Sequence, residues 1–295
     1  MLPAPLNFNR LRLFAAVVEH GSVTRAAAAL DISQPAVTKA VHDLERDLRV
    51  PLLDHAGRGV VPTEAGRLLA EYARRIFALA GEAERALGEF RGLARGRLAV
   101  GASTTIGIYL LPELLGVYRQ RHAAIELFLD IANTQTIVER LHARLLDLAL
   151  VEGPVEHDDL LAEPFRPDEL ALVTAPDHPL ARGGATVADL AALPWVMREP
   201  GSGTRDVVER ALAAAGVAPR VVMELGSTEA IKRAVAAGLG VSIVSRAALG
   251  LELAAGRLAV VPVAGFRVER TLTILQRRAT RPSPATTAFL GLLRE

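Results

Sequence analysis

The chain has 295 residues, enough for about two domains with separate hydrophobic cores. Hydrophobic residues make up 51% and charged residues 23%, which excludes a wholly disordered chain, and the formal net charge of +1 indicates no particular partner. The absence of cysteine excludes disulfides, thiolate metal sites and cysteine nucleophiles. No apolar run is long enough to span a bilayer and the N-terminus lacks the layout of a signal peptide, so we expect a soluble cytoplasmic protein.

The N-terminal segment predicts short helices joined by tight turns. Apolar residues recur at helical spacing in 8–18, 23–30 and 37–48. Ser33 and Pro35 precede the third of these segments and are typical of a helix start. Two short helices that are joined by a tight turn, the second led by polar residues, predict a helix-turn-helix.

The third helix begins with polar side chains that lie off its apolar stripe. A helix that enters the major groove by its N-terminal end presents such side chains to base edges and phosphates. Gln34 can pair bidentately with adenine, and Lys39 or Thr38 can reach a base or a phosphate. The candidate DNA-contacting residues of this helix are Ser33, Gln34, Pro35, Thr38, Lys39 and His42. The same pattern is compatible with the exposed polar face of an ordinary three-helix bundle.

The stretch from Phe14 to Gly66 resembles the LysR-type transcriptional regulators. The matching residues are Phe14, Val17, Gly21, Ser22, Ala26-Ala27, Leu30, Ser33-Gln34-Pro35-Ala36-Val37-Thr38-Lys39, Leu44-Glu45, Leu48, Leu52, Arg58 and Thr63-Glu64-Ala65-Gly66. The resemblance implies an α/β protein with an N-terminal all-α winged helix-turn-helix domain. It also implies a two-lobed effector domain similar to periplasmic binding proteins.

The resemblance and the sequence pattern together predict three parts. The expected parts are a winged helix-turn-helix DNA-binding domain at 1–62, a linker (dimerisation) helix at 63–91 and an effector-binding domain at 92–295, with lobe I at about 97–165 and 267–295 and lobe II at about 166–266. The stretch Gly92–Gly96 is the expected linker between the long helix and the effector domain.

The wing departs from the family pattern. Family members usually carry Leu-Phe-x-Arg there, where this chain has Leu52-Leu53-Asp54-His55. His55 replaces an arginine that approaches the minor groove, so a fixed charge becomes pH-dependent, and Arg58 remains for that contact. Residues 1–62 hold seven basic and six acidic side chains. A domain so close to neutral binds DNA weakly, so we expect several copies on a pseudo-palindromic operator.

Residues 63–91 predict one long helix with a heptad stripe. The stripe comprises Ala65, Leu69, Tyr72, Ile76, Leu79, Ala83, Ala86 and Phe90. A long helix that projects from a small domain cannot bury such a stripe alone, so we expect a homodimer through this helix. The resemblance adds a homotetramer through the effector lobes. The alternative is a helix that lies across its own second domain.

From Arg97 onward, strands alternate with helical segments, which predicts mostly parallel sheets with helices on both faces. The expected strands are Leu98–Ala102, Ile125–Ile131, Asp147–Val151, Leu170–Thr174, Val221–Leu225 and Val241–Ser245. Crossovers between the lobes are expected near Glu163–Pro167 and Val263–Arg267. A final strand at Thr271–Gln276 and a helix from Ser283 to Leu293 return to lobe I.

Three hydroxyl-rich loops, the first at 101–105, the second at 133–136 and the third at 199–205, each follow a strand and precede a helix. Because such turns meet at the carboxyl ends of strands, we expect them to line a crevice between the lobes. The candidate effector-binding residues are Ser103, Thr104, Thr105, Asn133, Thr134, Glu152, Ser202, Gly203, Thr204 and Arg205. Each serine or threonine could instead be only a helix N-cap.

These groups favour a small anionic effector, with Arg205 as the only nearby fixed cation. Glu152 weighs against a simple anion unless the ligand also carries a donor or Glu152 pairs with Arg205. The loops resemble those of LysR regulators of sulfur assimilation and carbon fixation. That resemblance implies sulfate, sulfite, or a small phosphorylated or carboxylated metabolite.

No enzyme signature is present. Gly201-Ser202-Gly203 lacks the third glycine of a dinucleotide fingerprint, and the chain has no Gly-x-Ser-x-Gly. The histidines show no metal-binding spacing, and His157-Asp158-Asp159 is typical of a solvated loop. We therefore expect no catalytic residue, no metal and no cofactor other than the effector. The alternative function is a constitutive DNA-binding protein whose C-terminal region only oligomerises.

Overall fold

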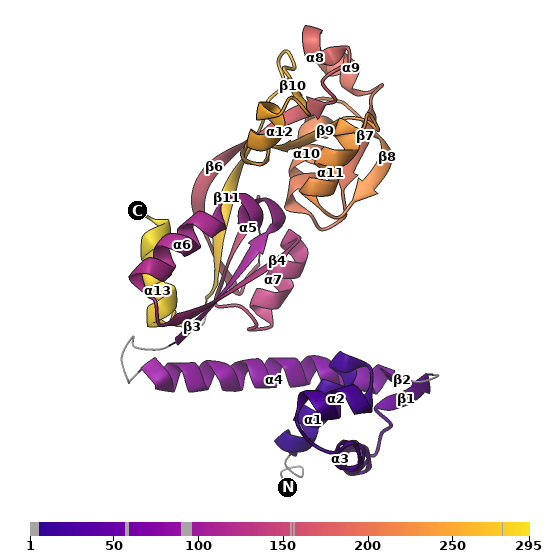
Figure 1. The fold of residues 1–295 in the computed structure, drawn as a ribbon, viewed down its shortest axis with the longest axis vertical. Helices are drawn as coiled ribbons and strands as arrows, with labels where there is room; N and C mark the ends of the chain where they lie inside the picture. The colour runs from indigo at the N-terminus through magenta and orange to yellow at the C-terminus, as the bar shows by residue number, and fades with distance from the viewer. Residues whose placement is uncertain (1–5, 57–58, 90–95, 154, 156, 279) are drawn as a thin grey trace. The chain divides into compact units, whose positions relative to one another are not determined.

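The computed structural model of the chain describes residues 6–56, 59–89, 96–153, 155, 157–278 and 280–295. The chain separates into two compact units, Met1–Glu84 and Arg85–Glu295, each with its own core (Figure 1). Most of the predicted linker Gly92–Gly96 lies outside the described residues. No helix among the described residues is long and apolar enough to cross a membrane.

The first unit contains the predicted helices and a wing. Its elements are α1 (Phe8–His20), α2 (Val23–Ala29), α3 (Gln34–Leu48), β1 (Leu53–Ala56), β2 (Gly59–Pro62) and α4 (Glu64–Glu89). Leu11 and Phe14 of α1 are fully buried against the apolar stripe of α3. Ala26 and Ala27 of α2 are also buried, and their small side chains allow close helix packing. The helix-turn-helix and the wing predicted for this segment are confirmed.

One contact attaches the wing to α3, and two others fix the start of α4 beside Leu52. The carboxylate of Glu45 accepts hydrogen bonds from the backbone N–H of Leu52 at 2.8 Å and of Leu53 at 3.2 Å. Thr63 caps α4 through a 2.9 Å bond from the Gly66 N–H to its hydroxyl. A Cβ atom at Gly66 would lie 2.0 Å from the Leu52 carbonyl oxygen, so only glycine allows this approach.

The stripe of α4 divides between two environments. Leu69 and Ile76, with the neighbouring Ala73, pack against the core of the first unit. Leu68, Tyr72 and Leu79 are 57%, 51% and 52% exposed. Of the predicted stripe, Phe90 and the side chain of Ala86 lie outside what the structure describes. The face left for a partner helix is therefore the Leu68/Tyr72/Leu79 stripe, which keeps Tyr72 and Leu79 of the predicted heptad and has Leu68 in place of the inward-packed Leu69.

The second unit has two lobes joined by two long strands (Figure 1). Lobe I contains β3 (Gly96–Ser103), α5 (Thr104–Tyr109), α6 (Leu111–Arg121), β4 (Ile125–Ala132), α7 (Thr134–His142), β5 (Leu148–Glu152) and α13 (Pro284–Leu293). Lobe II contains α8 (Leu180–Gly183), α9 (Val187–Leu190), β7 (Pro194–Arg198), α10 (Gly203–Ala214), β8 (Arg220–Leu225), α11 (Thr228–Ala236), β9 (Ser242–Ser245), η1 (Arg246–Ala248), α12 (Gly250–Ala254) and β10 (Ala259–Val261). The joining strands are β6 (Leu160–Thr174) and β11 (Val268–Arg277).

The sheets are mixed, whereas mostly parallel sheets were expected. β3 pairs with β4 and β5 in parallel, and β7 pairs with β8 in parallel. β6 pairs antiparallel with β9, β10 and β11, and β11 pairs antiparallel with β5. The alternation of strands and helices predicts the parallel pairs correctly, but the two joining strands run in opposite directions through both lobes.

The strand β6 is three times longer than the predicted Leu170–Thr174. Its first part contains the polar and proline-rich Glu163–Pro167, which resembles a loop and was assigned to a crossover. The antiparallel partner β11 holds this part extended, with Pro167 opposite Thr271 and Pro164 opposite Thr273. The crossover is therefore a strand, because pairing with a distant segment overrides the local signal.

Each lobe has its own core. In lobe I, Tyr118 of α6 packs edge-on against Phe289 of α13, with ring centroids 5.3 Å apart. In lobe II, the fully buried Trp195 donates its indole N–H to the Leu190 carbonyl at 2.9 Å. The return of the C-terminal helix to lobe I agrees with the sequence analysis.

A polar contact also ties the lobes together. Tyr109 of lobe I donates a hydrogen bond to Glu229 of lobe II, and the Lys232 ammonium lies 5.1 Å from the centre of the tyrosine ring. Lys232 is 3% exposed and forms 2.7 Å ion pairs with Glu229 and Glu252. Burial and the bond to Glu229 raise the pKa of Tyr109 to about 12.

The exposed stripe of α4 predicts where the chain self-associates. Replacing Leu68 and Leu79 with glutamate places charges in that interface and leaves the core-packed Ile76 intact. We expect the doubly substituted protein to sediment at half the mass of the wild-type assembly or less. Arg74→Glu, an exposed change elsewhere on α4, is the control and should sediment like the wild type. Unchanged sedimentation of the double variant would assign dimerisation to another surface.

Candidate functional sites

The N-terminal half of α3 presents the predicted DNA-contacting side chains on its outer face. Ser33, Gln34, Pro35, Lys39 and His42 are exposed and Thr38 is half-buried, whereas Val37, Val41 and Leu44 of the same helix are buried. Ser33 occupies the N-cap position but its hydroxyl makes no capping bond. This hydroxyl therefore remains available to a phosphate at the helix N-terminus.

The rest of the predicted DNA surface is only partly described. His42 Nδ1 lies 3.2 Å from one carboxylate oxygen of Glu45. The other oxygen of the same carboxylate accepts the hydrogen bond from the wing, so His42 and the wing contact one side chain. His55 belongs to β1, opposite Val60 of β2, and its side chain is not described. Arg58, the predicted minor-groove contact, lies outside the described residues.

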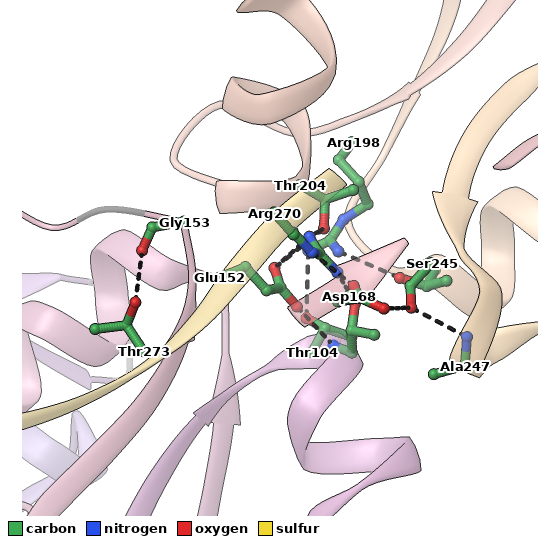
Figure 2. A network of polar contacts seen from close by, with 12 residues as sticks. Thr104, Glu152, Gly153, Asp168, Arg198, Thr204, Ser245, Ala247, Arg270 and Thr273 are labelled. Atoms are coloured by element: carbon green, nitrogen blue, oxygen red, sulfur yellow. Dashed lines mark hydrogen bonds and ion pairs between the residues drawn. The ribbon is translucent and has the colours of Figure 1, made fainter. Parts of the chain in front are cut away.

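The three hydroxyl-rich loops of the second unit meet where the lobes join. Figure 2 shows Thr104 of the first loop and Thr204 of the third near Glu152 and Arg270. The Gln135 N–H donates to the Gly201 carbonyl at 3.1 Å, which ties the second loop to the third. A Cβ atom at Gly203 would lie 2.7 Å from the Thr134 hydroxyl and 2.4 Å from the Glu152 carbonyl oxygen. Glycine at 203 thus lets α10 begin in direct contact with both other segments.

The centre of this cluster is a buried ion pair. The side chains of Glu152 and Arg270 are each 1% exposed, and their closest atoms lie 3.6 Å apart. Glu152 also accepts hydrogen bonds from the Thr105 N–H at 3.1 Å and from the Thr204 hydroxyl at 3.0 Å. Burial alone raises the pKa of Glu152, but the Arg270 charge and these hydrogen bonds hold that pKa below its ordinary value. Glu152 is therefore ionised at neutral pH.

Arg270 connects both lobes. Its Nε donates to Asp168 of β6 at 2.7 Å, and its terminal nitrogens donate to Thr204 at 2.8 Å and to Thr105 at 3.4 Å (Figure 2). The Ser245 hydroxyl of lobe II donates to the other oxygen of Asp168 at 2.7 Å. The guanidinium thus binds groups from four separate segments.

A second buried arginine lies in the same cluster. Arg198 is 4% exposed and binds Glu199 through two hydrogen bonds of 2.7 and 2.8 Å. Its Nη2, one of the two nitrogens that bind Glu199, also donates to Thr104 at 3.3 Å, and Nη1 donates to Thr228 at 3.4 Å. Both arginines are therefore neutralised by carboxylates, and neither contributes a net positive charge to the cluster.

Three buried hydroxyl groups of the cluster have no hydrogen-bond partner among the described residues. They belong to Ser103, Thr134 and Ser202, which are 1%, 9% and 1% exposed. Ser103 and Ser202 occupy the N-cap positions of α5 and α10 but make no capping bond, whereas Asn133 caps α7 through the Thr136 N–H at 2.9 Å. The simple N-cap interpretation therefore holds for Asn133 and fails for the two serines. Unpaired buried polar groups are rare and cost roughly 1–3 kcal/mol each.

Arg205 does not have the role that the sequence predicted. Its guanidinium binds Glu209 at 2.7 Å, Glu224, and the Arg198 carbonyl at 2.9 Å. The cations of the cluster are instead Arg198 and Arg270, and it is Arg270 that pairs with Glu152. Sequence reasoning missed both arginines because they lie inside strands, and only the pairing of β11 with β5 and β6 brings Arg270 to the loops.

The histidine-containing loop contacts a helix. His142 at the end of α7 lies beside His157, with ring centroids 5.0 Å apart, and their nitrogens and an Asp159 oxygen all lie within 4.8 Å of one another. All three side chains are exposed. The sequence placed His157 and Asp159 together but gave no signal for His142.

A change at Gln34 tests the DNA-reading surface. Gln34→Ala should reduce discrimination at one base pair by roughly 1–3 kcal/mol, because a bidentate contact to adenine is lost. Electrophoretic mobility shifts with a set of single-base operator variants measure this effect. Gln120→Ala, an exposed glutamine on α6, is the matched control. Identical base preferences for both variants would remove Gln34 from base recognition.

A change at Glu152 tests the buried ion pair. Because the pKa of Glu152 is lowered by folding, its stabilising contribution is present at neutral pH and is lost as the pH falls through that lowered pKa. Glu152→Gln should therefore cost about 3–5 kcal/mol at pH 7, and the difference from wild type should shrink below about pH 4. Urea unfolding followed by the fluorescence of Trp195, the single tryptophan, measures it. Glu269→Gln, exposed on β11, should show no such pH-dependent difference.

Comparison with known proteins assigns both units. Residues 8–67 match the bacterial regulatory helix-turn-helix protein, lysR family, and residues 91–295 match the LysR substrate binding domain. The chain is 40% identical over 285 residues to the RuBisCO operon transcriptional regulator of Allochromatium vinosum, covering 96% of this chain and 94% of that protein. Such relatives are named as regulators, not as enzymes.

Solved structures agree along the whole chain. Full-length CbnR in complex with its target DNA has a TM-score of 0.74 and 26% identity, covering 98% of this chain and 99% of CbnR. The regulatory domain of CcmR from Synechocystis PCC6803, solved with 2-PG, has a TM-score of 0.64 and 35% identity over 68% of this chain and 96% of that domain. The first unit and the two-lobed second unit are thus the DNA-binding and effector-binding parts of one protein, and the chain belongs to the LysR family of transcriptional regulators.

Proposed function

We propose that this regulator senses a small phosphorylated or carboxylated anion through the hydroxyl cluster of the second unit. The observation that carries the proposal is the set of three buried hydroxyls, on Ser103, Thr134 and Ser202, that have no partner among the described residues. An oxyanion accepts several hydrogen bonds at once, so one ligand can satisfy all three groups. No further cofactor is part of this proposal.

The charges of the cluster narrow the ligand class. Arg198 and Arg270 are already paired with carboxylates, so the anion would be held mainly by neutral donors and by the N-terminus of α10. Glu152 stays ionised close to these donors, which favours a ligand that also presents a hydrogen-bond donor or keeps its charge away from that carboxylate. The likeness to CcmR, solved with 2-phosphoglycolate, supports a small phosphorylated carboxylate over sulfate or sulfite.

We also propose that the regulator acts in the cytoplasm on a pseudo-palindromic DNA operator, as a homotetramer. The Leu68/Tyr72/Leu79 stripe of α4 would form the dimer. The second unit offers apolar side chains for the further interface, and each is more than one-third exposed: Val117, Phe128 and Ile131 in lobe I, and Val221 and Val222 in lobe II. Burial of such patches is a common driving force for association.

Calorimetric titration of the full-length protein with 2-phosphoglycolate, sulfate and sulfite tests the effector site. We expect saturable binding of 2-phosphoglycolate that Ser103→Ala, Thr134→Val and Ser202→Ala each weaken by roughly 1–3 kcal/mol. Thr134→Val and Ser202→Ala should leave the stability of the ligand-free protein unchanged or slightly higher, because each removes a buried hydroxyl that has no partner among the described residues. Ser103→Ala also removes a hydroxyl that helps to lower the pKa of Glu152, so the stability comparison is made with the other two variants. Loss of affinity without loss of stability distinguishes a ligand contact from a structural role.

Thr174→Val is the matched control for these variants. The Thr174 hydroxyl is also buried and without a partner among the described residues, but it lies at the far end of β6 in lobe II. Its removal should not change the affinity. Tighter binding of sulfate or sulfite than of 2-phosphoglycolate would contradict the proposed ligand class. Absence of binding by all three anions would favour the constitutive DNA-binding alternative, in which the second unit only oligomerises.

A further inference from the structure

A second cavity lies beside the joining strands, apart from the hydroxyl cluster. Its volume is about 670 Å³, which is within the usual range of small-molecule sites. Its walls come from both lobes: the segment after β5 and the first part of β6 on one side, and α10 on the other, with β11 between them. None of the loop residues 101–105, 133–136 or 201–204 lines it. We call this cavity the hinge groove.

The hinge groove combines apolar walls with two arginines. Val155, Pro164 and Val207 supply apolar surface, and Arg210 and Arg267 are exposed at the groove. Neither arginine has a carboxylate within ion-pair distance in the part of the chain that the structure describes. Their situation differs from that of Arg198 and Arg270, which are neutralised by acidic partners.

Among the described residues that line the groove, Glu269 is the one acidic side chain beside Arg210 and Arg267, so these two arginines exceed it by one positive charge. An uncompensated positive charge beside an apolar wall matches an anion that carries an apolar body. It does not match sulfate or phosphate alone, which have no apolar surface to bury. This chemistry differs from that of the hydroxyl cluster, where neutral donors predominate.

The groove and the hydroxyl cluster share their supporting elements. On β11, the exposed Glu269 and Thr271 of the groove flank the buried Arg270, which itself borders the groove. On α10, Thr204 at the first turn binds Glu152 and Arg270, and Val207 one turn later lines the groove. A molecule in the groove would therefore contact the strand and the helix that hold the buried ion pair.

We propose that the hinge groove is a second small-molecule site, which binds an organic anion with one carboxylate or phosphonate on a compact apolar body. Because the groove spans both lobes, an occupant would hold them in one relative arrangement and so modulate the response to the first ligand. This proposal is independent of which anion binds the hydroxyl cluster.

Calorimetric titration of the full-length protein with 3-phenylpropanoate and 3-phenylpropylphosphonate tests the proposal, with the neutral 3-phenylpropan-1-ol as the uncharged comparison. We expect saturable binding of at least one of the acids and at least tenfold weaker binding of the alcohol. Combined Arg210→Ala and Arg267→Ala should weaken the acid at least tenfold. Arg257→Ala, an exposed arginine of lobe II outside the groove, is the matched control and should bind like the wild type.

A second variant locates the bound acid. Thr271→Trp places a large side chain in the groove from an exposed position, so it should abolish binding without unfolding the protein, which the Trp195 unfolding transition can verify after correction for the added tryptophan. Ser202→Ala should leave the affinity for the acid unchanged. The proposal is overturned if neither acid binds, if the double arginine variant binds like the wild type, or if Ser202→Ala rather than Thr271→Trp removes binding.

Discussion

The two-lobed unit depends on one guanidinium group that is buried among carboxylates. Removing Arg270 and its partners from water is costly, and the cost is offset only while Glu152, Asp168 and the neighbouring hydroxyls stay in place. Those partners come from different strands and from both lobes, so the charge network is satisfied in one arrangement of β5, β6, β11 and α10. The same arrangement leaves three hydroxyls at its edge with no partner among the residues that the structure describes. The residues that fix the arrangement of the two lobes thus lie beside the hydroxyls that are available to a ligand.

The sequence predicted most of the local structure and little of the cluster's electrostatics. Helix starts, the short turn before Ser33, the wing and the strands of the lobe I core follow from patterns within a few residues of one another, and the sequence predicts their positions correctly. The hydroxyl loops were also identified, because strand-to-helix turns have a recognisable composition. Arg270 and Asp168 could not be identified in this way, since their roles exist only after strands distant in sequence pair with each other.

The same limit explains two corrections. A heptad pattern shows which residues of a helix are apolar but not which of them its own domain will cover, so Leu69 and Ile76 were assigned to the partner face although they pack inward. Arg205 is the cation nearest in sequence to the hydroxyl loops. Its guanidinium instead forms ion pairs with Glu209, one helical turn away, and with Glu224. In both cases, the residues that compete for the side chain can be read from the sequence. The distances that decide which of them it contacts exist only in the folded structure.

The joining strands restrict how the lobes can move. β6 and β11 are hydrogen-bonded to each other over nearly their whole shared length, with one irregularity between Leu272 and Thr273. Sliding one strand along the other by a residue would break this ladder and would turn Arg270 from the interior to solvent. Twisting the pair breaks no ladder bond, since paired strands are naturally twisted. Any signal that passes between the lobes of this protein is therefore carried as a rotation about the strand pair and not as a translation along it.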